Sequence, residues 1–179
     1  RVIESALLQF DIPYRVYGGQ RFFERLEIKN ALAYMRLILN CHDDVAFERV
    51  VNIPPRGIGE RTVDAVREHA RNISISMWSA AKAMIVDKNL NTRSANALAA
   101  FLNLINEMTN TLEALPLSEL AENSIEMSGL IEMHRREKGE RGQSRVENLE
   151  ELVGACKNFS PESIDTVSYT HLRAHETLP

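Results

Sequence analysis

The chain has 179 residues, of which 44% are hydrophobic and 26% are charged, a composition typical of a globular domain with a sizeable core. Its formal net charge of −4 argues against a strongly basic nucleic-acid-binding protein, so any contact with DNA must depend on local clusters of positive charge. The two isolated cysteines, Cys41 and Cys156, argue against a disulfide framework and against a cysteine metal site. No apolar run is long enough to cross a bilayer and no signal peptide opens the sequence, so we expect a cytoplasmic protein without membrane contact.

The N-terminal segment combines the end of a helix with a short strand. Apolar residues at helical spacing continue to Phe10, and the Asp-Ile-Pro triplet at 11–13 interrupts that pattern. Residues 14–17, Tyr-Arg-Val-Tyr, predict a strand that the Gly-Gly pair at 18–19 ends. Because the sequence starts without Met inside an amphipathic pattern, we expect it to continue a longer protein.

Beyond residue 24 the sequence predicts only helices and turns. Ile28, Leu32, Met35 and Leu39 form one apolar stripe at helical spacing, and later segments repeat the pattern. The expected helices cover residues 24–40, 43–51, 60–70, 76–86, 92–112, 116–128, 129–138 and 144–157. We therefore predict a mainly α fold, with a short α/β segment at the N-terminus followed by a multi-helix domain that contains a helix-hairpin-helix-like element.

The most informative element is the loop Pro-Pro-Arg-Gly-Ile-Gly at 54–59, which joins two predicted helices. Its glycines let the backbone approach an oxyanion closely, and the first amides of the next helix lie unpaired at the positive end of the helix dipole. A phosphate can accept hydrogen bonds there, and we expect Ile58 to turn inward and anchor the loop. The candidate DNA-binding residues are Arg56, Gly57, Ile58, Gly59, Arg61 and Thr62. The same spacing is also typical of a tight turn between packed helices that binds nothing.

A second candidate is the charged run at 134–145. Five Lys and Arg residues against two Glu give it a local charge of +3 in a chain whose total is −4. The possible secondary DNA contacts are Arg135, Arg136, Lys138, Arg141 and Arg145. A solvated helix end is the alternative interpretation of such a run.

The sequence contains none of the common catalytic signatures. There is no GxxxxGK[ST] phosphate-binding loop, no GxSxG, no HExxH and no zinc pattern, so no catalytic residue is predicted. His171 and His175 have the spacing of a metal pair on a helix but lack a third ligand, so we expect no metal site. Residues 166–179 have no periodicity, and we interpret them as a tail foreign to the rest of the chain.

Three blocks resemble the UvrD/Rep/PcrA-type DNA helicases of superfamily 1. The first runs from YRVYGGQRFFER at 14–25 to residue 37, the second from AFERVVN at 46–52 to RGIG at 56–59, and the third from EKGE at 137–140 to residue 152. The resemblance implies an ATP-driven 3′-to-5′ helicase with two RecA-like motor domains. Residues 1–24 would end a motor segment, residues 25–165 would form most of the helical accessory domain called 2B, and residues 166–179 would be unmatched.

The same resemblance implies a role and partners. The Gly-Ile-Gly loop at 57–59 would grip duplex DNA near a junction of single and double strands, in a protein of DNA repair or replication. The remaining helicase domains, and possible repair proteins, are further expected partners. The intact parent would need ATP and Mg²⁺, whereas this fragment is predicted to bind no cofactor and to be inactive alone. Two alternatives stay open: a free-standing helix-hairpin-helix DNA-binding protein, and a helical protein–protein adaptor.

Overall fold

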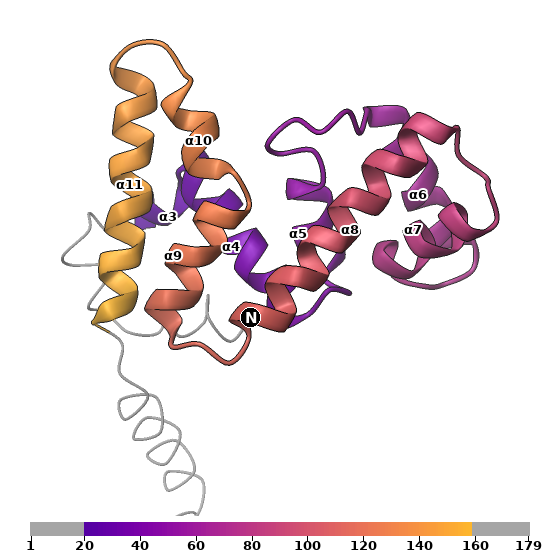
Figure 1. Ribbon diagram of the computed structural model, residues 1–179, viewed down its shortest axis with the longest axis horizontal. Helices are drawn as coiled ribbons and strands as arrows, with labels where there is room; N and C mark the ends of the chain where they lie inside the picture. The colour runs from indigo at the N-terminus through magenta and orange to yellow at the C-terminus, as the bar shows by residue number, and fades with distance from the viewer. Residues whose placement is uncertain (1–19, 159–179) are drawn as a thin grey trace, which may run out of the picture.

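In the computed structural model, the described part of the chain, residues 20–158, is helical without strands (Figure 1). Its helices are α3 (Gln20–Glu24), α4 (Leu26–Leu39), α5 (Asp44–Val50), α6 (Glu60–Asn72), α7 (Met77–Val86), α8 (Thr92–Leu112), α9 (Leu117–Met127), α10 (Leu130–Arg135) and α11 (Glu140–Lys157). The mainly α prediction is confirmed for this part. The strand predicted at 14–17 and the segment 166–179 lie outside the described residues.

Polar side chains fix the starts of several helices by capping. The side-chain oxygens of Asp43, Ser76 and Asn91 each accept a hydrogen bond from the backbone N–H three residues later, at the starts of α5, α7 and α8. These bonds satisfy amides that have no partner within the helix. The predicted helix starts near residue 43 and at Glu60 are both confirmed.

The predicted helix boundaries are wrong around residue 25 and between α10 and α11. The segment 24–40 is not one helix, because Arg25 adopts an extended conformation and separates α3 from α4. Helix α11 begins at Glu140 rather than residue 144, so Gly142 lies inside a helix rather than in a loop. A Cβ atom on Gly142 would lie 2.3 Å from the carbonyl oxygen of His134. Glycine at this position therefore serves the close crossing of α10 and α11.

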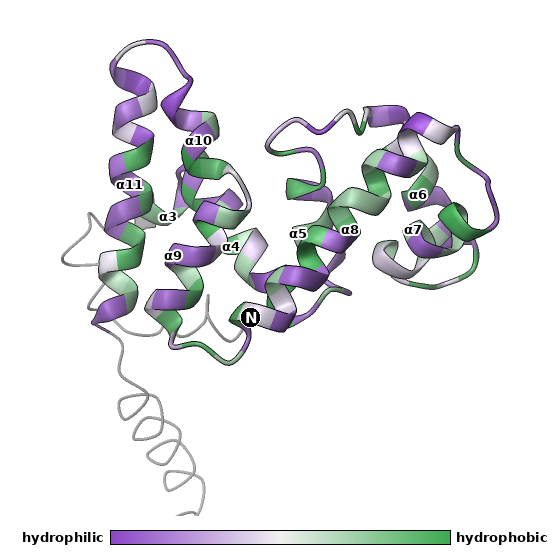
Figure 2. Ribbon diagram, viewed as in Figure 1, coloured by the Kyte–Doolittle hydropathy of each residue, from purple (hydrophilic) through white to green (hydrophobic). Residues whose placement is uncertain are grey.

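Helix α4 lies at the centre of the fold. Its residues Ile28, Tyr34, Met35 and Leu37 are fully buried, and it packs against α5, α8, α9 and α11. Figure 1 shows α9, α10 and α11 on one side of the molecule and α6 and α7 on the other, joined by the long α8. Hydrophobic and hydrophilic bands alternate along α9 and α11 (Figure 2), as in helices with one buried side. No helix between residues 20 and 158 combines the length and apolarity that crossing a bilayer requires.

Candidate nucleic-acid interface

The loop between α5 and α6 is held from its inner side. The side-chain oxygen of Asn52 accepts hydrogen bonds from the backbone N–H groups of Arg56 (2.7 Å) and Ile58 (3.2 Å). Ile58 is buried, with 1% of its surface exposed, so the expected inward turn is confirmed. Gly57 has φ +79°, in the left-handed region that favours glycine. The Asn52 side chain, the buried Ile58 and the positive φ of Gly57 together fix the conformation of this turn.

The outer side of this loop is open. Gly57 and Gly59 are exposed, and a Cβ atom at either position would meet nothing within 4 Å. The amides of Thr62 and Val63 donate to the Gly59 carbonyl, at 3.1 and 3.2 Å, whereas no described residue accepts a bond from the amides of Gly59, Glu60 or Arg61. These amides lie at the positive end of the 13-residue helix α6. Donors with this arrangement can bind an anion.

Arg56, the first predicted DNA contact, points into the protein. Its guanidinium donates to the carbonyl oxygens of Val50 (3.2 Å), Pro54 (3.1 Å) and Ser128 (3.1 Å), and to the Tyr34 hydroxyl. It also lies 5.7 Å from the centre of the Tyr34 ring. The structure therefore places Arg56 at the predicted loop but uses its charge to fasten that loop to distant helices.

Tyr34 extends this attachment. Its hydroxyl donates to the carbonyl oxygen of Ile53, the residue before the loop prolines. Burial raises the pKa of Tyr34 to about 12, against the opposing effect of the nearby Arg56 charge. The phenol is therefore protonated at neutral pH and remains a donor. Sequence reasoning assigned no role to Tyr34 or to Asn52, although an Asn before a turn is a recognisable signal.

Thr62 and Arg61 point in different directions. Thr62 is buried, and its hydroxyl donates to the Ser94 hydroxyl (3.2 Å) in the first turn of α8, so it joins two helices. Arg61 is exposed at the start of α6. Of the two arginines predicted to bracket the loop, Arg61 is therefore the one whose side chain faces solvent.

The cations of the charged run at 134–145 also fall into two groups, those that pair with carboxylates and those that are exposed. Arg145 donates to both carboxylate oxygens of Glu137, at 2.9 and 3.1 Å, and lies 4.0 Å from a carboxylate oxygen of the buried Glu27. Arg136 pairs with Glu132 at 3.0 Å. The remaining three cations are exposed and form no ion pair with a described residue: Arg135, Lys138 and Arg141.

The two candidate segments meet at a cleft. Pro54, Pro55 and Arg56 line one side of it, and Met133 and Arg136 line the other. The loop and α10 are therefore neighbours although they are far apart in the sequence. Among residues 20–158, no group of three or more His, Cys, Asp or Glu side chains is placed to hold a metal ion. The pair His171 and His175 lies outside the described residues.

Comparison with known proteins decides the family. The sequence-family model for the UvrD-like helicase C-terminal domain matches residues 1–174. This match includes much of the segment 166–179 that was expected to be foreign. The chain belongs to this family. It is 52% identical over 160 residues to DNA helicase II of Escherichia coli (strain K12), and 51% identical over 180 residues to DNA helicase II of Haemophilus influenzae. It is 36% identical over 165 residues to the ATP-dependent DNA helicase PcrA of Bacillus subtilis.

These similarities cover most of this chain but a small part of each relative. They extend over 89%, 99% and 92% of this chain, and over 22%, 25% and 22% of the three relatives in the same order. The chain therefore corresponds to about a quarter of a UvrD-like helicase or less. The resemblance inferred from the three sequence blocks is confirmed.

Proposed function

We propose that this chain is the part of a UvrD-like DNA helicase that grips the duplex, through the loop before α6. Residues 25–165 would form the helical accessory domain, and residues 1–24 would end a motor segment. The complete parent would be an ATP-driven 3′-to-5′ helicase of repair or replication, with ATP and Mg²⁺ bound outside this chain. One observation carries the proposal: the exposed, unpartnered amides at the start of α6, in a loop fixed by its own side chains.

In this proposal the predicted site residues have two kinds of role. The amides of Gly59, Glu60 and Arg61 and the Arg61 side chain contact phosphate, and Gly57 keeps the backbone exposed. Arg56, Ile58 and Thr62 position the loop without touching DNA. Contacts of this kind bind the DNA backbone without reading the base sequence. Arg135, Lys138 and Arg141 would add a weaker attraction that salt screens.

Position 59 permits a sharp test. Gly59 is the N-cap of α6 with φ −75° and open space around it, so both Asn and Asp fit and both favour helix capping. Gly59→Asp places a carboxylate where the phosphate would sit, whereas Gly59→Asn adds a neutral side chain of the same shape. Binding to a fluorescent DNA duplex is measured by anisotropy at low salt. We expect the affinity for the duplex to be about tenfold or more lower for Gly59→Asp than for Gly59→Asn, with both variants folded.

Arg61 provides the second arm of the test. Arg61→Ala should weaken duplex binding and reduce the slope of log K against log salt by about one unit. Its control is Arg71→Ala, since Arg71 is also exposed and lies at the opposite end of α6. Binding by Gly59→Asp and Gly59→Asn that equals the binding of the unmodified chain would refute the loop as the contact. Absence of duplex binding by the unmodified chain at low salt would favour the adaptor alternative.

A further inference from the structure

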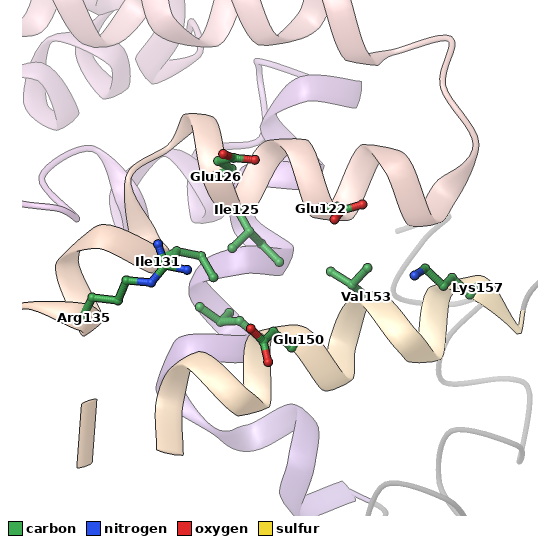
Figure 3. A pocket seen from close by; sticks show the side chains of 9 residues that line it. Glu122, Ile125, Glu126, Ile131, Arg135, Glu150, Val153 and Lys157 are labelled. Carbon is green, nitrogen blue, oxygen red and sulfur yellow. The ribbon is translucent and has the colours of Figure 1, made fainter. Parts of the chain in front are cut away.

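A groove separate from the α6 loop lies where α9, α10 and α11 meet. It encloses about 340 Å³. Its floor is apolar: Ile125 and Leu149 are buried there, and Ile131 and Val153 are half-buried. Figure 3 shows the side chains of Ile125 and Val153 lying between the two helices that form the long walls, α9 and α11. Covering apolar side chains that are partly exposed to solvent removes apolar surface from water, which favours binding of a partner.

The walls of the groove are acidic. Glu122 and Glu126 project from α9 and Glu150 from α11, while one cation lies toward each end, Arg135 and Lys157 (Figure 3). All five charged side chains are exposed, and none forms an ion pair with any described residue. Three acidic side chains therefore flank an apolar strip on both sides, and none of them pairs with a cation among the described residues.

The three glutamates along the walls disfavour DNA as the occupant. Phosphate groups would meet Glu122, Glu126 and Glu150 at close range, and repulsion between like charges opposes binding. The groove therefore requires an occupant with the opposite charge. It also requires apolar side chains to cover Val153 and Ile131.

We propose that the groove binds a basic amphipathic helix of another protein. An α-helix presents an apolar stripe with residues on both of its flanks, so Lys or Arg on the two flanks can reach α9 and α11 at once. An extended segment presents only every second side chain to a surface, and it offers one row rather than three. The groove thus joins the helicase part to a protein partner at a surface that is separate from the α6 loop and shares only Arg135 with the DNA contacts proposed above.

The test uses the 179-residue chain and a synthetic probe. The probe is a fluorescein-labelled helical peptide of about 18 residues, long enough to form a helix, with a Leu stripe flanked by Lys. A twin peptide carries Glu in place of each Lys. Anisotropy should report binding of the basic peptide and none of the acidic twin. NMR amide shifts on binding should fall on α9 and α11.

Charge reversal on the walls identifies the site. The double variant Glu122→Lys/Glu126→Lys removes no ion pair within the described residues, so the fold should be retained. Its matched control is Glu107→Lys/Glu113→Lys, which makes the same charge change at exposed positions in and just after α8. We expect the wall variant to weaken peptide binding about tenfold or more and the control to change it by less than about twofold.

Several outcomes would overturn the proposal. Equal losses in the two double variants would indicate general attraction between opposite charges rather than a site. Equal affinity for the basic and acidic peptides would remove the role of the glutamates. A failure of the basic peptide to bind would remove the groove as a docking surface. Retained affinity in Val153→Ser would contradict the apolar floor, for which we expect a loss of about threefold.

Discussion

The loop before α6 and the tip between α10 and α11 both place arginines beside glycines, but they present positive charge in different ways. In the loop, Arg56 turns inward and backbone amides face solvent. At the tip, Arg145 turns inward and the exposed cations are Lys138 and Arg141 at the ends of long side chains. Backbone donors have fixed directions and suit one phosphate position, whereas flexible cations give attraction without a defined geometry. Under the proposed function, the loop would hold a phosphate and the tip would attract DNA.

The two inward arginines, Arg56 and Arg145, both connect segments that are far apart in the sequence. Arg56 connects the loop to the carbonyl oxygen of Ser128 at the end of α9, and Arg145 connects α11 to Glu137 and Glu27. Each closes a contact between segments far apart in the chain. A count of arginines along the sequence therefore overstates the charge that this fold offers to a ligand.

The largest effect is expected from breaking the tip at Gly142. A methyl group there would meet the His134 carbonyl oxygen at 2.3 Å and that of Glu137 at 3.0 Å, so α10 and α11 must separate. Gly142→Ala should lower the free energy of unfolding by about 3 kcal/mol in urea denaturation. Ser144→Ala, at an exposed position two residues later, is the control and should change it by less than about 0.5 kcal/mol. A tip that tolerates Gly142→Ala would contradict the close crossing.

A smaller effect should separate Arg56 from Arg61. Arg56→Ala leaves the carbonyl oxygens of Pro54 and Ser128 without a donor and removes one donor from Val50 and from the Tyr34 hydroxyl, so we expect a loss of about 2 kcal/mol in unfolding free energy. Arg61→Ala should leave stability within about 0.5 kcal/mol because the side chain is exposed. Urea denaturation checks both variants. Arg56→Lys tests the geometry, since one ammonium group cannot reach all four acceptors, and full stability in that variant would contradict it.

The sequence predicted well the features that depend on local chemistry. The helix starts near residue 43 and at Glu60 and the inward Ile58 all follow from residues within one turn of each other. The direction of Arg56 could not be predicted in this way, because its acceptors include Tyr34 and Ser128, 22 and 72 residues away.

Glycine was equally ambiguous from sequence alone. The sequence alone does not distinguish Gly57 from Gly142. In the structure, Gly57 allows a turn with positive φ, whereas Gly142 allows α10 and α11 to approach closely. A turn requires only neighbouring residues, whereas a crossing requires knowledge of which helix lies opposite. The predicted helix start at residue 144 is wrong for this reason, because α11 begins at Glu140.

The smallest expected effect concerns pH at the tip. The hydrogen bond with His134, and then the contacts with Arg145, hold the pKa of Glu137 below its ordinary value of 4.5. A carboxyl group with a lower pKa in the folded state contributes stability above its unfolded pKa and loses it as the pH falls through the folded value. The melting temperature should therefore decline as the pH falls below about 4.5, and Glu137→Gln should make that decline shallower. Thermal melts across this range measure the slope.

Glu132→Gln is the control because Glu132 pairs with Arg136 in an exposed position, where water screens the interaction. A slope that Glu137→Gln and Glu132→Gln change equally would mean that the inward Arg145 adds nothing to the tip beyond an ordinary surface ion pair.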